Sequence, residues 1–142
     1  MNVTTRAARD ADAPALVELL RQLGYDGAET FIARRLAELA AHPDALTLVA
    51  EGEGQVLGVI SLHFVPQLAR AADFCRISYF CVAEQARSLG IGALLEGLAV
   101  DEARRRRCDR IELHSSSRRV DAHRFYARQG YVESPKYLMK DV

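Results

Sequence analysis

The stretch Arg87-Ser88-Leu89-Gly90-Ile91-Gly92 decides the interpretation of this chain, because it joins a predicted strand directly to a long predicted helix. The first turn of a helix carries unpaired backbone N–H groups and a partial positive charge, which together favour an anion. Glycines at 90 and 92 have no Cβ, so backbone amides can approach such an anion closely. On these residues alone, a pyrophosphate site and a simple tight turn are both open.

Two familiar phosphate-binding patterns are excluded at this turn. The P-loop pattern requires Gly-x4-Gly-Lys-Ser/Thr, and neither a lysine nor a hydroxyl residue follows Gly92. The dinucleotide-binding pattern requires a third glycine three residues after the second, and Leu95 stands there. The turn therefore belongs to neither of these nucleotide-binding classes.

A second segment lies downstream of the turn and changes its interpretation. The first segment reads Val82-x4-Arg87-x2-Gly90-x-Gly92, and the second runs from Ala122 to Tyr131 with Phe125-Tyr126 and Gly130-Tyr131 inside it. They resemble the two signatures of the GNAT superfamily of N-acyltransferases, Arg/Gln-x-x-Gly-x-Gly/Ala and Ala-x-x-Phe/Leu-Tyr-x-x-x-Gly-Phe/Tyr, in the family's order. The resemblance is most specific between residues 77 and 131, and it implies an N-acetyltransferase that uses acetyl-CoA.

The resemblance also implies which residues bind the cofactor. In this family the strand before the turn pairs with the pantetheine arm, and the turn itself holds the pyrophosphate on its backbone amides. Arg119 occupies the position of a frequent family asparagine, and for it a cofactor contact and a solvated helix start are both open. The expected cofactor-binding residues are Phe80, Val82, Arg87, Ser88, Leu89, Gly90, Ile91, Gly92, Ala93 and Arg119.

Tyr126 is the expected catalytic residue. It matches the family tyrosine that commonly protonates the departing CoA thiolate, and a phenol can donate such a proton. The alternative is that its ring only packs under the cofactor. The resemblance implies direct attack of an amine on the thioester, with the oxyanion of the tetrahedral intermediate held by a backbone amide, that of Val82.

The general base is not assigned by the sequence. Many family members use a glutamate on the strand before the turn, and the two positions where we expect it hold Ser78 and Arg76. Glu84 at the end of that strand, His114 at the end of the next strand and a chain of water molecules are the alternatives.

Residues 1–142 are expected to form a single α+β domain, with a mixed, mostly antiparallel sheet flanked by helices. Asp10 and Asp12 are expected to cap the first helix, which has Pro14 in its first turn and ends at Gly24. A hairpin is expected around Glu51-Gly52-Glu53-Gly54. Strands are predicted over 3–9, 46–50, 56–65, 74–82, 111–114 and 131–140, with a turn at 134–135, and further helices over 28–41, 89–106 and 120–129. In the second helix the apolar set is Phe31, Ile32, Leu36 and Leu39.

Composition limits the partners. Nineteen basic and nineteen acidic residues cancel, so no global field attracts nucleic acid or an anionic membrane. The run Arg104 to Arg107 is interpreted as the end of a helix, where cations complement the dipole, with nucleic-acid binding as the alternative. Cys75, Cys81 and Cys108 lack metal-ligand spacing, so reduced thiols and no metal are expected. With no signal peptide and no apolar span, we expect a cytoplasmic protein.

The expected function is transfer of an acetyl group from acetyl-CoA to a primary amine of a small molecule or a peptide. The acceptor is expected to lie among the first two helices, the loop over 66–73 and the C-terminal strands. A homodimer is compatible with the family. The second interpretation is a non-catalytic acyl-CoA-binding regulatory module. The missing strand glutamate motivates it, whereas the tyrosine of the second signature argues against it.

Overall fold

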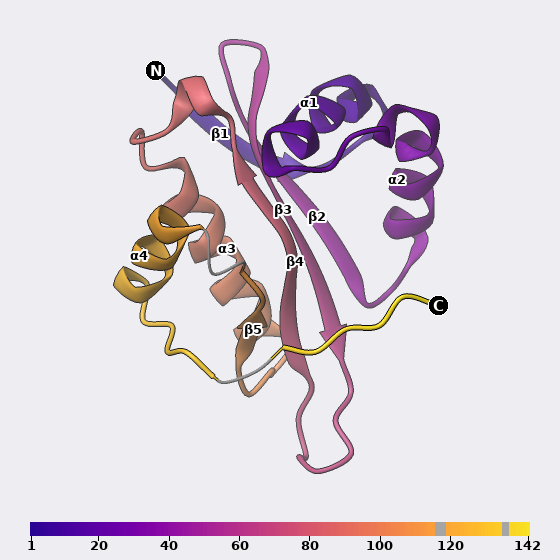
Figure 1. Cartoon of the computed structure of the whole chain (residues 1–142), viewed down its shortest axis with the longest axis vertical. Coiled ribbons are helices and arrows are strands. Elements are labelled where there is room, and N and C mark those ends of the chain that lie inside the picture. Colours follow the sequence, from indigo (N-terminus) through magenta and orange to yellow (C-terminus); the bar gives the residue numbers. More distant parts are fainter. Residues whose placement is uncertain (116–118, 135–136) are drawn as a thin grey trace. The chain divides into compact units, whose positions relative to one another are not determined.

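The computed structural model describes residues 1–115, 119–134 and 137–142. The chain divides into two compact units, Met1–Glu112 and Leu113–Val142, and each unit is described by itself. Figure 1 shows the course of the chain through both units.

The strands form a sheet with the order β1-β2-β3-β4-β5, so that neighbours in sequence are neighbours in the sheet. β1 pairs with β2, β2 with β3 and β3 with β4, in each case antiparallel. The mostly antiparallel sheet that the sequence predicts is therefore confirmed. The strands are β1 Val3–Ala7, β2 Ala45–Gly52, β3 Gln55–Val65, β4 Phe74–Val82 and β5 Ile111–Leu113.

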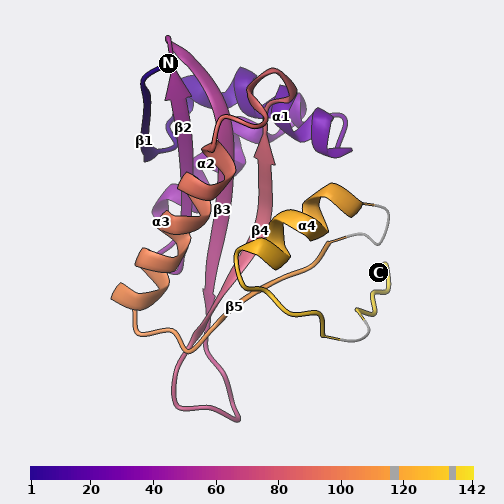
Figure 2. The same cartoon turned by 90° about the vertical axis from the view of Figure 1, so that its left-hand side faces the viewer.

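Helices cover both faces of the sheet within the first unit. Figures 1 and 2 show α1 and α2 on one face and α3 on the other. The helices are α1 Ala13–Leu23, α2 Ile32–Ala41, α3 Ile91–Arg105 and, in the second unit, α4 Val120–Arg128, with 3-10 turns η1 Asp10–Asp12, η2 Ala28–Thr30 and η3 Glu84–Ala86. We call the two sides of β3 and β4 the α1 face and the α3 face.

Alternation along β3 divides the core between these faces. Gly58 lies on the α3 face, where a Cβ would come 3.1 Å from both Ile91 Cγ2 and Leu95 Cδ1. On the α1 face, Cys81 lies opposite Val59, and its thiol donates a hydrogen bond to the backbone oxygen of Leu19 at 3.3 Å. The start of α3 and the middle of α1 are therefore fixed to the same two strands from opposite sides.

The hairpin between β2 and β3 is tighter than predicted. Both strands extend into the expected loop, which leaves Glu53 and Gly54 as its two central residues. Their φ angles of 54° and 77° are both left-handed. That combination is the two-residue turn whose twist matches the twist of the flanking strands.

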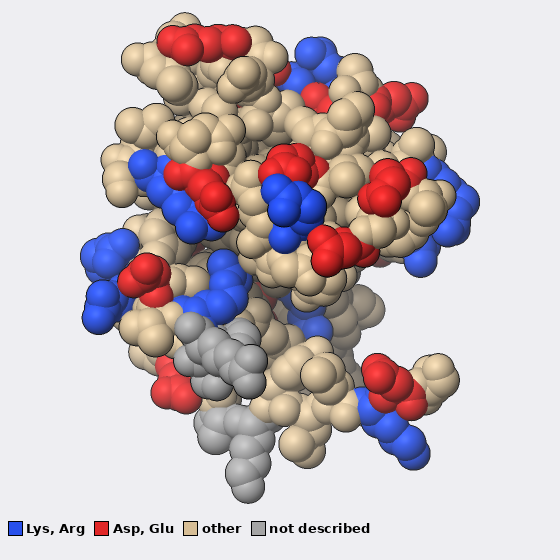
Figure 3. All heavy atoms as spheres, turned by 45° about the horizontal axis from the view of Figure 1, so that its top comes forward, with Lys and Arg blue, Asp and Glu red and all other residues tan. Residues whose placement is uncertain are grey.

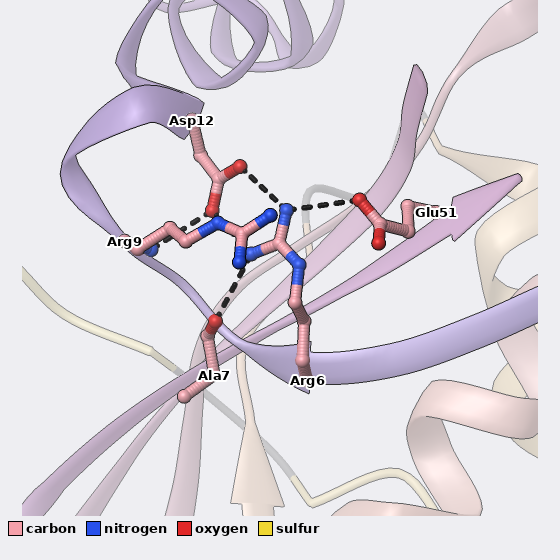
Figure 4. Close-up of polar contacts among 5 residues, drawn as sticks. All are labelled: Arg6, Ala7, Arg9, Asp12 and Glu51. Carbon is pink, nitrogen blue, oxygen red and sulfur yellow. Dashed lines mark hydrogen bonds and ion pairs between the residues drawn. The ribbon is translucent and has the colours of Figure 1, made fainter. Parts of the chain in front are cut away.

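An ionic cluster joins β1, η1 and β2 (Figure 4). The guanidinium of Arg6 donates to both carboxylate oxygens of the buried Asp12, at 2.7 and 2.8 Å, and to Glu51 Oε2 at 3.0 Å. The backbone N–H of Arg9 also donates to Asp12 Oδ2, at 2.8 Å. Asp12 stands at the N-cap of α1, as predicted, but its side chain makes no capping hydrogen bond to that helix, because the carboxylate is used by Arg6 and by the 3-10 turn that precedes the helix.

The second predicted helix begins later than its apolar pattern indicates. Gly27 has a φ of 86° and is followed by the 3-10 turn η2, so that α2 starts at Ile32. Phe31 is the residue before the helix, with a non-helical φ of −140°, and its side chain is 42% exposed. Its predicted place in the apolar set is wrong, whereas Leu36 is buried as expected.

The prediction of a strand over 131–140 is wrong for the residues of this range that the structure describes. Residues 131–134 and 137–142 form neither strand nor helix, and Val132, Leu138 and Met139 are largely exposed. β-branched and aromatic composition does not make a strand unless a neighbour takes up its backbone hydrogen bonds. Of the turn predicted at 134–135, Pro135 lies outside the described residues.

Candidate active site

The turn between β4 and α3 is anchored at its beginning. The backbone N–H of Ala83 donates to the oxygen of Leu57 at 2.8 Å, which continues the β3–β4 pairing by one residue. Ala83 and Ala86 are buried at 2% and 1% exposure, so the 3-10 turn η3 packs into the first unit. Residues 87–90 that follow are exposed. An exposed turn thus starts from a fixed strand end.

The backbone of this turn is shaped to present amide groups. Ser88 and Gly90 have left-handed φ angles of 70° and 82°, and α3 starts directly after Gly90. Within the described part of the chain, no hydrogen-bond acceptor is found for the backbone N–H groups of residues 88 to 93. Successive amides in such a conformation form an anion-binding concavity, and the helix dipole adds positive potential. The residues present therefore fit a pyrophosphate group.

The backbone N–H of Arg87 differs from the amides that follow it. It already points to the oxygen of Glu84, at 3.4 Å, across the 3-10 turn η3. Its side chain is exposed at the entry to the turn. The run of amides without an intramolecular acceptor accordingly starts one residue later than the sequence predicts.

The two strand residues expected to meet the pantetheine arm share one orientation. Since the N–H of Ala83 points to β3 and backbone groups alternate along a strand, the N–H groups of Phe80 and Val82 point away from β3. They point to the side of β4 that lies opposite β3, just before the chain enters the turn. This orientation agrees with the predicted role of the two residues and does not test it.

A β-bulge in β4 brings two polar residues together on the α1 face. Ser61 lies opposite Tyr79 and Leu62 opposite Ile77, so Ser78 is the additional residue in β4. The Nδ1 atom of His63 lies 2.7 Å from Ser78 Oγ, within hydrogen-bond distance. Burial lowers the pKa of His63 below its usual range, and the charges of His42 and Arg76 act in the same direction. His63 is therefore neutral near pH 7.

Arg76 occupies the other position where a strand glutamate was expected. It lies opposite His63, and its guanidinium is 3.7 Å from Glu112 Oε1 and 5.5 Å from the ring centroid of Phe74. A guanidinium has donors and no acceptor, so Arg76 adds positive charge to the α1 face and cannot replace the expected glutamate as a base.

The other residues weighed for proton transfer or thiol chemistry lie in less suitable places. Glu84 is exposed in η3, where its backbone N–H donates to Gln22 Oε1 at 3.0 Å. Cys81 is buried and donates to α1, and burial raises the pKa of the Cys75 thiol to about 12. Neither thiol is a nucleophile at neutral pH.

The second unit carries the remaining predicted residues. Tyr126 is half-buried in α4, with its ring in edge contact with Phe125 at 5.5 Å and Tyr131 at 5.6 Å between centroids. Arg119 is the exposed residue before α4. His114 is exposed and stacks on Tyr137 at 3.8 Å.

The arginine run at the end of α3 is partly used for packing. Arg106 donates to the backbone oxygen of Pro43 at 2.9 Å and to Glu102, and its guanidinium lies 3.9 Å from the ring centroid of Phe64. Arg105 pairs with the same glutamate. On the face drawn in Figure 3, acidic and basic side chains are intermixed. Arg105 and Arg106 are therefore used in contacts at the end of α3.

The described residues offer no metal site and no helix that could span a membrane. They contain no cluster of three or more His, Cys, Asp or Glu side chains arranged to hold a metal ion. None of their helices combines the length and the apolar character that crossing a bilayer requires.

Fold, turn and sequence together define an acetyltransferase. The sequence model of the "Acetyltransferase (GNAT) family" matches residues 13–131, and the chain belongs to this family. An aminoalkylphosphonate N-acetyltransferase of Salmonella typhimurium is 34% identical over 120 residues, which are 84% of this chain and 75% of that protein.

Solved structures support the same fold over nearly the whole chain. A transcriptional regulator from Bacillus halodurans C-125 superposes with a TM-score of 0.90 at 25% identity, covering 99% of this chain and 100% of that one. A glucosamine-6-phosphate N-acetyltransferase from Arabidopsis thaliana has a TM-score of 0.88 at 21% identity, covering 99% of each chain. At such identities the likeness concerns the fold and not the substrate.

Proposed function

We propose that this protein transfers the acetyl group of acetyl-CoA to the primary amine of a small molecule, with residues 1–142 acting as one catalytic domain. The observation that carries the proposal is the run of amides over residues 88–93, which have no acceptor in the described chain and precede α3. Such a run compensates a pyrophosphate without a lysine. Acetyl-CoA supplies the activated acetyl group as a thioester.

The chain's residues have separate roles in this proposal. The amides of residues 88–93 hold the pyrophosphate, Arg87 and Arg119 add positive charge near the phosphates, and the backbone of Phe80 and Val82 pairs with the pantetheine arm. The amide of Val82 stabilises the negative charge that develops on the thioester oxygen. Tyr126 donates a proton to the CoA thiolate as it leaves.

The first acceptors to test are aminoalkylphosphonates, because the curated relative carries them in its name. Other small primary amines and an amino-terminal peptide complete the panel. Release of CoA with any member of the panel supports the amine-acetylating function. Binding of acetyl-CoA without turnover on the whole panel overturns it and favours the non-catalytic module.

Two variants test the assigned roles. Tyr126→Phe removes only the hydroxyl group, so we expect kcat to fall about 10²-fold while acetyl-CoA binding measured by calorimetry is unchanged. Gly90→Ala forces an alanine to a φ of 82°, which costs about 1–2 kcal/mol and distorts the turn, so acetyl-CoA binding should weaken. Unchanged kcat in Tyr126→Phe would remove the tyrosine as proton donor.

A further inference from the structure

The bulge in β4 creates a polar site on the α1 face that the proposed function leaves without a role. Ser78 is the additional residue of the bulge, and its hydroxyl lies 2.7 Å from Nδ1 of His63 on β3. Next to it along β4, Tyr79 is 42% exposed and makes an edge contact with Tyr25, whose ring centroid is 5.4 Å away. A neutral imidazole and a hydroxyl thus lie beside two exposed aromatic rings.

Besides burial, two cationic groups lower the pKa of His63, and one of them, Arg76, is itself paired with Glu112 at 3.7 Å. Arg76 lies opposite His63 on β4, and His42 at the end of α2 is the other charged group that acts on it. Among the described residues, no carboxylate forms an ion pair with His63. Burial, the largest effect, and these two charges lower the pKa of His63, so that the ring is free to take up a proton at neutral pH.

The hydrogen bond leaves one lone pair available in either tautomer. If Ser78 donates to Nδ1, its oxygen can accept a proton from a donor while passing its own proton to His63. If Nδ1–H donates to Ser78, the Nε2 atom of His63 has the free lone pair. In both cases the incoming proton ends on the imidazole ring.

We propose that the His63–Ser78 pair is the proton acceptor for the attacking amine. This inference rests on the amine-acetylating function proposed above. The nitrogen of the neutral amine forms a bond to the thioester carbonyl carbon, and its excess proton moves through water molecules to the imidazole of His63, because Ser78 lies four residues along β4 from the Val82 amide. The C–S bond breaks with its electron pair remaining on sulfur, and the thiolate takes its proton from Tyr126. His63 then loses its proton to solvent, so atoms and charges balance over one turnover.

His63→Gln tests this role, because glutamine can hydrogen-bond to Ser78 but takes up no proton. We expect kcat to fall about 10²-fold, with acetyl-CoA affinity by calorimetry unchanged, since the amide run lies at the start of α3. Ser78→Ala should lower kcat about fivefold to tenfold, through loss of one orienting hydrogen bond. The matched control is Ser61→Ala, because Ser61 lies two residues from His63 on the α1 face of β3 and is buried at 6% exposure. This variant should keep wild-type kcat.

The pH profile provides a readout that a structural role would not change. The pH dependence of wild-type kcat/KM should be measured with two amines that differ in pKa. One limb of the profile should shift with the pKa of the amine, and a second limb, below pH 6.5, should lie at the same pH for both amines. Activity falls through this second limb as His63 becomes protonated. The limb should be absent in His63→Gln, and its presence in wild type supports the inference even if that variant does not fold.

The outcomes separate the two proposals. A wild-type enzyme that acetylates amines, while His63→Gln and Ser61→Ala have equal kcat, overturns the role of His63 and leaves the function intact. The absence of an amine-independent limb in wild type has the same meaning. A wild-type protein that binds acetyl-CoA but acetylates no amine overturns the function and this inference with it.

Discussion

Replacing Gly58 with alanine is expected to destabilise the first unit, because the added methyl group has no room. The new Cβ would lie 3.1 Å from Ile91 Cγ2 and Leu95 Cδ1 and 3.3 Å from the Cys81 backbone oxygen. Since favourable contacts between carbon atoms begin at about 3.5 Å, these carbons must separate by about 0.4 Å. The Cys81 oxygen belongs to the paired backbone of β4, so α3 is the element that moves. Overpacking of this kind costs about 1–3 kcal/mol.

The matched control is Gly97→Ala, in the middle of α3. Outside its own helix backbone, a Cβ at Gly97 meets no atom of the described residues within 4 Å, so alanine should raise the free energy of unfolding by about 0.5–1 kcal/mol through its helix propensity. Urea denaturation measures both changes, and calorimetry measures acetyl-CoA binding. Gly58→Ala should also bind acetyl-CoA several-fold more weakly, because the amides of residues 88–93 move with the start of α3. A Gly58→Ala protein as stable as Gly97→Ala, with wild-type affinity, would refute this packing argument.

Two further variants and one labelling experiment test the electrostatics. Asp12→Asn breaks the ion pair with Arg6 and should lower the free energy of unfolding by about 2–3 kcal/mol, whereas Glu18→Gln, in an exposed pair, should leave it unchanged. Because Arg6 lowers the pKa of Asp12 below 3.8, the wild-type stabilisation is present above that pH and is lost as pH falls through the lower folded value. Urea midpoints measured between pH 2 and 6 should therefore fall more steeply toward acid in wild type than in Asp12→Asn. Cys75 is buried with a pKa raised to about 12, so mass spectrometry should find it unlabelled by iodoacetamide at pH 8 until urea unfolds the chain; labelling at the rate of a free thiol would contradict its burial.

The central part of the fold was predictable because its signals are local. β4 was predicted with its observed bounds, and the Gly-containing turn before α3 was predicted from its residue types. Leu36 was placed in the apolar set of the second helix from helical periodicity and is buried. Membership of the family was also predictable, because its two signatures are contiguous stretches of sequence.

Other features could not be predicted because they depend on distant pairing. His63 belongs to no sequence motif, and its partner Ser78 lies 15 residues away across a bulge. A shift of one residue in register exchanges the two faces of a strand, and the sequence has no mark for this shift. The ion pair of Asp12 was missed for the same reason, since an aspartate before a helix is usually its cap. The strand predicted over 131–140 failed because composition does not supply a pairing partner.

The bulge at Ser78 explains how β4 contributes apolar side chains to the core on one face and polar side chains to the other face. Val82 and Phe80 lie opposite Gly58 and Ile60, on the α3 face, and strict alternation would place Ile77 on the α1 face. The additional residue reverses the alternation, so that Ile77 and Cys75 are buried on the α3 face while Arg76, Ser78 and Tyr79 all lie on the other. Deleting Ser78 should therefore restore regular pairing, with Tyr79, Ile77 and Arg76 still opposite Ser61, Leu62 and His63, so that Ile77 stays in the core and only the redirected hydroxyl group is lost. A bulge retained at the cost of ladder hydrogen bonds is consistent with a role for the side chains that it redirects.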